Sequence, residues 1–103
     1  MLMCSLIKDT FELTRYHARR RGLLPDLKSQ SWFEFARLIR NCLGHKFLFE
    51  FNNHDRTVLP VHWHGRVISV DMDGKPLPMA LFGYVEAWQL FTEMRQYAID
   101  RGL

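Results

Sequence analysis

The stretch "SWFEFARLIRNCLGH", residues 31–45, carries the pattern that decides the fold. Its apolar side chains recur at helical spacing, at Trp32, Phe35, Ala36, Ile39, Cys42 and Leu43. Ser31 and Glu34 have the spacing of a capping box, in which the two side chains satisfy free backbone N–H groups at a helix start. Gly44 is suited to ending the helix, because glycine readily adopts the left-handed geometry of a helix terminus. The sequence therefore predicts an amphipathic helix that begins at Ser31 and ends at Gly44.

Two further segments have helical periodicity. In residues 4–20 the pattern runs through Leu6, Thr10, Leu13 and His17, with Ile7, Phe11 and Thr14 beside them. From about Gly83 the helical period returns and continues nearly to the C-terminus, at Val85, Trp88, Phe91, Met94 and Ala98. Residues 22–29, which contain Pro25, are predicted to form the loop between the first two helices.

The segment between the second and third predicted helices has a different period. "FLFEFNNHDRT", residues 47–57, is an aromatic connector whose "NNHD" tip predicts a turn. Residues 58–78 combine β-branched residues, alternation and a "DG" pair, which together predict a short antiparallel hairpin around Asp73 and Gly74. The three prolines of this segment should keep the hairpin short and at an edge.

The order of elements, helix, helix, hairpin and helix, predicts a mainly α fold. We expect residues 1–103 to form one domain, a small helical bundle with a short β-hairpin inserted before the C-terminal helix. Such a thin core, beside 14% aromatic residues, favours either an oligomer or a compact monomer that uses its phenylalanines internally. The opening "MLMCSLIKD" is too short for a membrane span and lacks the basic start of a signal peptide, so we expect a cytoplasmic protein.

The densest basic run is "RYHARRRG", in a chain with a net charge of +3. Arg15, Arg19, Arg20 and Arg21 crowd the end of the first predicted helix. Basic residues are favourable there in any case, because they complement the helix dipole and precede a helix-stopping glycine. The run therefore predicts either a solvated helix end or an RNA-binding patch that contacts phosphates.

Motifs for other chemistries are weak. His62 and His64 lie two apart, hence on one face of a strand, which is compatible with metal binding, but no third ligand is evident nearby. Cys4 and Cys42 lack metal-motif spacing and are expected to be reduced thiols. The sequence contains no phosphate-cradling glycine loop and no Ser-His-Asp pattern. We therefore predict neither a metal site nor a cofactor.

Arg40, Asn41 and His45 surround the last turn of the second predicted helix. Residues five apart on a regular helix differ by about 140° in direction and about 7.5 Å in height, so Arg40 and His45 cannot readily serve one small substrate from an undisturbed helix. Either the helix yields at Gly44 and turns His45 back, or a second chain brings its own copy of the pair. A structural interpretation is also open, in which Arg40 pairs with a carboxylate and His45 caps carbonyl groups.

"LIRNCLGH", residues 38–45, resembles the signature of the HEPN superfamily (higher eukaryotes and prokaryotes nucleotide-binding). In that signature an arginine, a polar residue, three variable residues and a histidine lie near a helix end, and Arg40, Asn41 and His45 match them. The "SWFEFA" helix, the "WHGRVISVDMDGKPL" hairpin and the closing helix resemble a bacterial HEPN-like nuclease subgroup over residues 29–101. HEPN domains usually have four or more helices, whereas three are predicted here.

The resemblance implies metal-independent RNA cleavage by a homodimer whose motifs meet at the interface. The RNA 2′-hydroxyl would attack the adjacent phosphorus and expel the 5′-oxygen, leaving a cyclic phosphate. Arg40 would hold the phosphoryl oxygens, His45 would move a proton, and Asn41 would orient the substrate or His45. Such a toxin or defence effector would be controlled by an antitoxin or another regulatory protein. Phe47 stands where members regulated by a nucleotidyltransferase often carry tyrosine, so modification there is not expected.

Two other functions fit the same residues. A non-catalytic HEPN-like module would use the cationic pocket to bind a nucleotide, RNA or a protein without turnover. A small metal-binding or structural protein would carry the motif by accident. The endoribonuclease is the leading hypothesis, because all three motif residues are present, although resemblance of fold does not by itself settle function.

Overall fold

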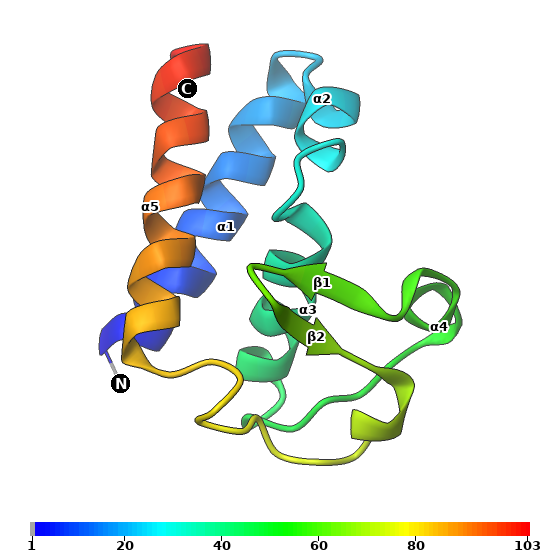
Figure 1. Cartoon of the computed structure of the whole chain (residues 1–103). Coiled ribbons are helices and arrows are strands. Elements are labelled where there is room, and N and C mark those ends of the chain that lie inside the picture. Colours follow the sequence, from blue (N-terminus) through cyan, green and yellow to red (C-terminus); the bar gives the residue numbers. More distant parts are fainter. Residues whose placement is uncertain (1) are drawn as a thin grey trace.

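The structure is a computed structural model that describes residues 2–103, and it is mainly helical (Figure 1). Its elements follow in the order α1 (Leu2–Arg20), α2 (Leu24–Lys28), α3 (Phe33–Gly44), α4 (Asn53–Val58), β1 (Val61–Trp63), β2 (Arg66–Ile68), the 3-10 helix η1 (Val70–Met72) and α5 (Tyr84–Arg101). The two strands form an antiparallel hairpin before the C-terminal helix, so the predicted fold class is confirmed. Within the described residues, no helix combines the length and the apolar character needed to cross a membrane.

The three longest helices, α1, α3 and α5, form the body of the molecule (Figure 1). Helix α1 packs against both α3 and α5. Helices α1 and α5 run in the same direction and α3 runs in the opposite one. At one end, the Arg21 guanidinium donates hydrogen bonds to the carbonyl oxygens of Arg101 and Gly102, at 3.0 and 3.1 Å. At the other end, the start of α1, the end of α3 and the start of α5 lie together.

Helix α3 is the central helix of the core. Its buried residues are Phe33, Phe35, Ala36, Leu38, Ile39, Cys42 and Leu43, so the apolar face predicted for this segment is confirmed. Each large apolar side chain that is fully buried contributes about 1.5–3 kcal/mol. The other residues of the helix fall within about 120° of arc. They form the polar stripe of α3, which consists of Glu34, Arg37, Arg40, Asn41 and Gly44.

The start of α3 differs from the prediction. The helix begins at Phe33, and the predicted capping box between Ser31 and Glu34 does not form. The preceding turn already supplies an acceptor, because the Phe33 N–H donates to the Gln30 carbonyl at 3.0 Å. The Glu34 carboxylate instead accepts hydrogen bonds from Arg37, one turn further along the helix.

Two segments that were predicted to be loops or turns contain short helices. Helix α2 lies inside the predicted loop 22–29, with Pro25 in its first turn, where the missing proline N–H has no helical partner to lose. Helix α4 begins within the predicted "NNHD" turn. Asn52 and Asp55 form a reciprocal capping box there, with N–H to side-chain oxygen distances of 2.8 and 3.0 Å. Asn and Asp favour both turns and helix starts, which explains the error.

The hairpin turns at His64 and Gly65, not at Asp73 and Gly74 as predicted. His64 and Gly65 have φ values of 47° and 77°, the left-handed conformations that a two-residue hairpin turn requires. The Gly74 N–H donates to the Phe49 carbonyl at 2.7 Å. The "DG" pair therefore makes a second turn that faces the connector, and does not close the hairpin.

Helices α1 and α5 form as predicted, but several residues of their apolar patterns face solvent. The buried residues are Ile7, Phe11, Thr14 and Ala18 in α1 and Ala87, Leu90, Met94 and Tyr97 in α5. Leu13, Val85 and Trp88 are exposed. Phenylalanines are largely used within the chain, since Phe11, Phe33, Phe35, Phe49, Phe51 and Phe82 are buried. The aromatic content by itself therefore does not require a partner chain.

Candidate functional site at the end of helix α3

Arg40 lies on the polar stripe, one turn before the end of α3, and leans against α1. Its Nε is 2.5 Å from Oε1 of Glu12, and the two side chains are 32% and 42% exposed. This contact is an ion pair without the alignment of a hydrogen bond, and Nε has no hydrogen-bond acceptor among the described residues. A guanidinium has five N–H donors in a planar fork. Because Nε itself is buried, an external anion would reach Arg40 through the part of its side chain that is exposed.

His45 follows the last residue of α3 at a tight reversal of the chain. The N–H groups of His45 and Phe47 both donate to the Cys42 carbonyl, at 3.1 and 2.9 Å. Lys46 and Phe47 have left-handed φ values of 58° and 67°, whereas Gly44 does not. The prediction that Gly44 takes the left-handed geometry is therefore wrong. The helix still ends where predicted, and the chain reverses two residues beyond it.

The His45 imidazole is exposed and lies beside a carboxylate. Its Nδ1 is 3.2 Å from Oε2 of Glu50, which follows the reversal. No hydrogen bond or ion pair joins Arg40 to His45 in the part of the chain that the structure describes. Asn41 is half-buried on the polar stripe. The structural interpretation predicted that Arg40 pairs with a carboxylate, and it does so with Glu12. It also predicted that His45 caps carbonyl groups, but the His45 side chain pairs with Glu50.

The two carboxylates beside the motif were not predicted from the sequence. Glu12 lies on α1 and Arg40 lies on α3, with α2 between them in the chain, and no local sequence pattern links the two residues. Glu50 had a signal, because it stands between two aromatic residues in "FEF". Phe49 and Phe51 are buried and Glu50 is exposed, as alternation in an extended segment requires.

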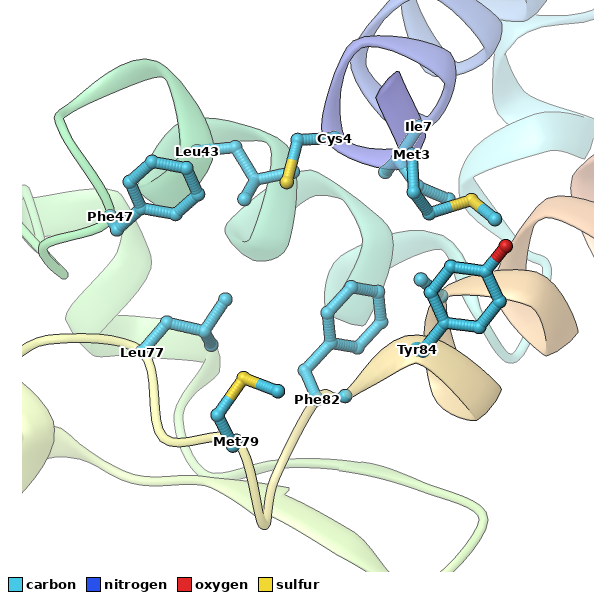
Figure 2. Close-up of a pocket in the computed structure, with 11 residues that line it drawn as sticks. Met3, Cys4, Ile7, Leu43, Phe47, Leu77, Met79, Phe82 and Tyr84 are labelled. Atoms are coloured by element: carbon cyan, nitrogen blue, oxygen red, sulfur yellow. The ribbon is translucent and has the colours of Figure 1, made fainter. Parts of the chain in front are cut away.

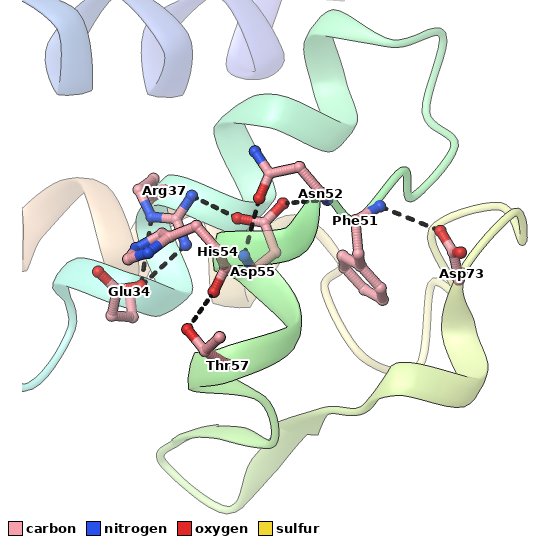
Figure 3. Close-up of polar contacts among 8 residues, drawn as sticks. All are labelled: Glu34, Arg37, Phe51, Asn52, His54, Asp55, Thr57 and Asp73. Atoms are coloured by element: carbon pink, nitrogen blue, oxygen red, sulfur yellow. Dashed lines mark hydrogen bonds and ion pairs between the residues drawn. The ribbon is translucent and has the colours of Figure 1, made fainter.

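A second arginine of the polar stripe belongs to a largely buried network (Figure 3). Arg37 Nη1 donates to Asp55 Oδ1 at 2.7 Å, and Arg37 Nε and Nη2 donate to Glu34 at 3.2 and 2.9 Å. Burial alone lowers the pKa of the Arg37 guanidinium, but the hydrogen bonds to Glu34 and Asp55 outweigh burial and raise this pKa. Arg37 is therefore a structural link between α3 and α4, and Arg40 is the arginine of the stripe with free donors.

The predicted RNA-binding arginines lie at the far end of α1 from His45 (Figure 1). Arg21 caps the C-terminal carbonyls of α5. The Arg20 guanidinium lies over the Tyr16 ring, 5.8 Å from its centroid, and Arg15 lies 6.0 Å from a phenylalanine ring centroid. Arg19 is exposed. Arg21 thus has a structural role, and RNA binding by the four arginines stays a prediction.

The predicted pairing of His62 and His64 on one strand face is wrong. His62 is exposed on β1, whereas His64 lies in the hairpin turn and points to α5. The His64 Nε2 is 2.7 Å from Oε2 of Glu93, and the Trp63 indole donates to the other oxygen of Glu93 at 3.2 Å. Among the described residues, no three His, Cys, Asp or Glu side chains gather in the geometry of a metal site.

An apolar groove borders the end of α3 (Figure 2). Its volume is 140 Å³, and its wall includes Met3, Cys4, Leu43, Phe47, Phe82 and Tyr84. The described residues that line the groove include no charged side chain to orient a phosphate or to transfer a proton. Cys42 is buried, and burial raises the pKa of its thiol to about 11, so the neutral and unreactive form dominates near pH 7. We therefore place the groove and Cys42 outside the candidate site.

Comparison with known proteins provides no relative from which a role could be transferred. No family model, no curated protein and no solved structure matches this chain. The HEPN resemblance of Arg40, Asn41 and His45 therefore stays a prediction, and the chemistry of the site is argued from its residues.

Proposed function

We propose that this protein is a metal-independent endoribonuclease of the toxin or defence-effector type, with Arg40, Asn41 and His45 as its catalytic residues. The observation that carries the proposal is the presence of a half-buried guanidinium and an exposed imidazole at one end of α3, each beside one carboxylate. Neither group is buried in the core. Phosphate binding and proton transfer, the two tasks of RNA cleavage without a metal, suit these two side chains.

Arg40 binds the phosphodiester in this proposal. Its planar fork of donors matches two phosphoryl oxygens at once. A phosphate would displace Glu12 from the guanidinium, because it can accept the hydrogen bonds that Glu12 leaves unmade. Arg40 would then stabilise the negative charge that grows on the phosphoryl oxygens in the transition state.

His45 transfers the proton that the reaction must move. The 2′-hydroxyl loses its proton as its oxygen bonds to phosphorus, the bond from phosphorus to the 5′-oxygen breaks, and that oxygen gains a proton. The products are a 2′,3′-cyclic phosphate and a 5′-hydroxyl. Imidazole titrates near neutral pH and can serve at either oxygen. Asn41 would orient the substrate or the imidazole through its amide.

A second copy of the chain completes the site in this proposal. Arg40 and His45 contact different carboxylates of their own chain. A two-fold axis near the end of α3 would bring Arg40 of one copy toward His45 of the other. Large apolar side chains are exposed by more than half near the start of α5, at the same end of the molecule, at Met79, Tyr84, Val85 and Trp88. Burial of this surface would favour association.

A binding module without catalysis is the second candidate, and the separation of Arg40 from His45 within one chain is the observation that favours it. The two side chains contact different carboxylates, Glu12 and Glu50, and not each other. A site that only binds RNA or a nucleotide needs the guanidinium but no proton transfer. The two candidates therefore differ in what happens when His45 is removed.

RNA cleavage in the presence of a chelator tests the proposal. Purified protein is incubated with total RNA and EDTA, and the fragment ends are analysed. We expect 2′,3′-cyclic phosphate and 5′-hydroxyl ends. Arg40→Ala and His45→Ala should each lower the cleavage rate by about 100-fold or more, as expected for loss of a general acid or base or of phosphate stabilisation.

The matched control is His62→Ala, which removes an exposed histidine on β1 that the proposal does not use. This variant should cleave like the wild type. Cleavage that requires an added divalent metal would contradict the proposed mechanism. RNA binding without cleavage, retained in His45→Ala and weakened in Arg40→Ala, would identify the binding module.

A further inference from the structure

The His45 imidazole has one ring nitrogen beside a carboxylate and the other without a partner among the described residues. Nδ1 is 3.2 Å from Oε2 of Glu50. The contact is an ion pair without the alignment of a hydrogen bond. The negative charge of the carboxylate still favours the form of the neutral imidazole that carries its proton on Nδ1, the ring nitrogen beside it. In that form Nε2 has a free lone pair.

The backbone on the histidine side of this contact is fixed. The His45 N–H donates to the Cys42 carbonyl at 3.1 Å, and the His45 carbonyl accepts from the Leu48 N–H at 3.1 Å. Lys46 and Phe47 between them hold two successive left-handed conformations. Non-glycine residues adopt this geometry at a cost, so the surrounding structure must enforce it. The reversal therefore fixes the position of the His45 Cα, from which the imidazole side chain extends.

The backbone on the glutamate side is fixed as well. The Phe49 N–H donates to the Lys75 carbonyl at 3.0 Å, and the Phe51 N–H donates to Asp73 Oδ1 at 3.0 Å (Figure 3). Phe49 and Phe51 are buried with 1% and 8% exposure. Because side chains alternate along an extended segment, Glu50 must point away from the core. The buried and hydrogen-bonded residues Phe49 and Phe51 thus place the Glu50 carboxylate beside His45.

We propose that Glu50 is a positioning residue that holds the His45 imidazole through Nδ1 and leaves Nε2 as the atom that exchanges a proton with the RNA. This inference rests on the proposed function. When Nε2 takes the proton of the 2′-hydroxyl, Glu50 stabilises the imidazolium that forms. When Nε2 returns a proton to the leaving 5′-oxygen, the imidazole becomes neutral again with its other proton still on Nδ1.

A second histidine of the chain provides a built-in comparison. His64 contacts Glu93 through Nε2 at 2.7 Å, the opposite ring nitrogen from the one that His45 uses. The two histidines should therefore favour opposite tautomers when they are neutral. Glu93 lies on α5, outside the proposed catalytic site, and contacts Trp63 and His64, so a change there should alter the tautomer of His64 and not that of His45.

The tautomers can be measured by nitrogen NMR of the imidazole rings at alkaline pH, where imidazole is neutral. We expect the wild-type His45 signal to report a proton on Nδ1 and the His64 signal a proton on Nε2. Glu50→Gln should shift His45 away from its Nδ1-protonated form and leave His64 unchanged. Glu93→Gln should do the reverse. A His45 tautomer that is unaffected by Glu50→Gln would overturn the inference.

Kinetics then separates positioning from a structural role. Glu50→Gln should lower kcat for RNA cleavage by about tenfold or more with a smaller change in KM, and Glu50→Asp should restore part of the rate. The melting temperature should stay unchanged, because both side chains are exposed. An unchanged kcat would overturn the catalytic part of the inference. Absence of wild-type cleavage would contradict the proposed function, while the tautomer measurement would still decide whether Glu50 orients His45.

Discussion

Arg37 of α3 and Asp55 of α4 form an ion pair in which Nη1 and Oδ1 are 2.7 Å apart and the Asp55 side chain is 2% exposed. The second carboxylate oxygen of Asp55 accepts the Asn52 N–H at 3.0 Å. Both oxygens of a buried carboxylate are thereby satisfied, as burial of a charge requires. This pair ties the connector that carries Glu50 to the helix that carries Arg40.

Loss of this carboxylate should destabilise the fold. We expect Asp55→Ala to lower the free energy of unfolding by about 3 kcal/mol, because it breaks a largely buried ion pair and removes half of a capping box. Urea unfolding measures the change. Asn53→Ala in the same helix removes an exposed side chain and should change the stability by less than about 0.5 kcal/mol. Equal effects of the two substitutions would contradict the role assigned to the pair.

Stability should fall in acid, in part because of Asp26. Arg101 Nε and Tyr97 Oη donate to its carboxylate at 2.5 and 2.9 Å. The hydrogen bond from Arg101, followed by that from Tyr97, lowers the pKa of Asp26 below its ordinary value. A carboxyl group with a lowered pKa in the folded state stabilises the fold above its unfolded pKa, and this contribution is lost as the pH falls through the folded pKa.

Unfolding in urea, followed from about pH 6 down to about pH 2, tests this dependence. Asp26→Asn should flatten the loss of stability below about pH 4 without removing it. Asp73 and Glu86 also have lowered pKa values, caused first by backbone hydrogen bonds from Phe51 and Gly83 respectively, and should account for part of the remaining slope. A variant with the full wild-type slope would show that Asp26 is not coupled to folding.

Relief of backbone strain at Lys46 should stabilise the protein. Lys46 has a φ of 58° and an exposed side chain. Glycine adopts this conformation without the Cβ clash, while it increases the entropy of the unfolded chain. We expect Lys46→Gly to raise the free energy of unfolding by about 1 kcal/mol, and Lys46→Ala, which keeps the Cβ, to change it little. A lower melting temperature for the glycine variant than for the alanine variant would refute this account.

The arginine run should divide into one structural residue and a part that binds RNA. Arg21→Ala should lower the free energy of unfolding by about 0.5–1 kcal/mol, because it removes hydrogen bonds to the last carbonyls of α5. The double change of Arg19 and Arg20 to alanine should leave stability within about 0.5 kcal/mol.

The double variant should instead reduce the salt dependence of RNA binding. Each lost phosphate contact lowers the slope of log K against log salt concentration by about 0.7 for single strands. Binding is measured at several salt concentrations for the wild type and for the double variant. An unchanged slope would identify Arg19 and Arg20 as a solvated helix end.

Mixed dimers test whether the catalytic pocket is shared between two chains. Arg40→Ala and His45→Ala homodimers should each be folded and inactive. If one pocket needs an arginine and a histidine from opposite chains, the mixed dimer keeps one intact pair and should recover part of the activity. The measurement is RNA cleavage by differently tagged variants that are co-expressed and purified through both tags.

Three other outcomes of this experiment are informative. Full activity in either homodimer would contradict the catalytic assignment of Arg40 or His45. A folded but inactive mixed dimer would reject the pairing across chains. A protein that light scattering finds strictly monomeric at micromolar concentration would exclude the composite site.

The sequence alone determined the long helices, because their apolar spacing is a local property of consecutive residues. The apolar face of α3 and its end at Gly44 were predictable in this way. The hairpin existed where the sequence placed strand-forming residues, but its turn fell at His64 and Gly65. Asp73 and Gly74 were equally good turn residues by local criteria. In the folded chain the Gly74 N–H donates to the Phe49 carbonyl and Asp73 accepts from the Phe51 N–H, so the two residues bind the connector and do not close the hairpin.

The tertiary structure decided which residues surround the motif. Arg40 and His45 were identifiable from the sequence, whereas Glu12 reaches Arg40 only because α1 packs beside α3. Glu50 reaches His45 only because Lys46 and Phe47 reverse the chain in a conformation that their residue types disfavour. Periodicity specifies that a helix forms and which side chains are apolar. The partners of a polar side chain depend on how separate elements pack, and no local pattern contains that information.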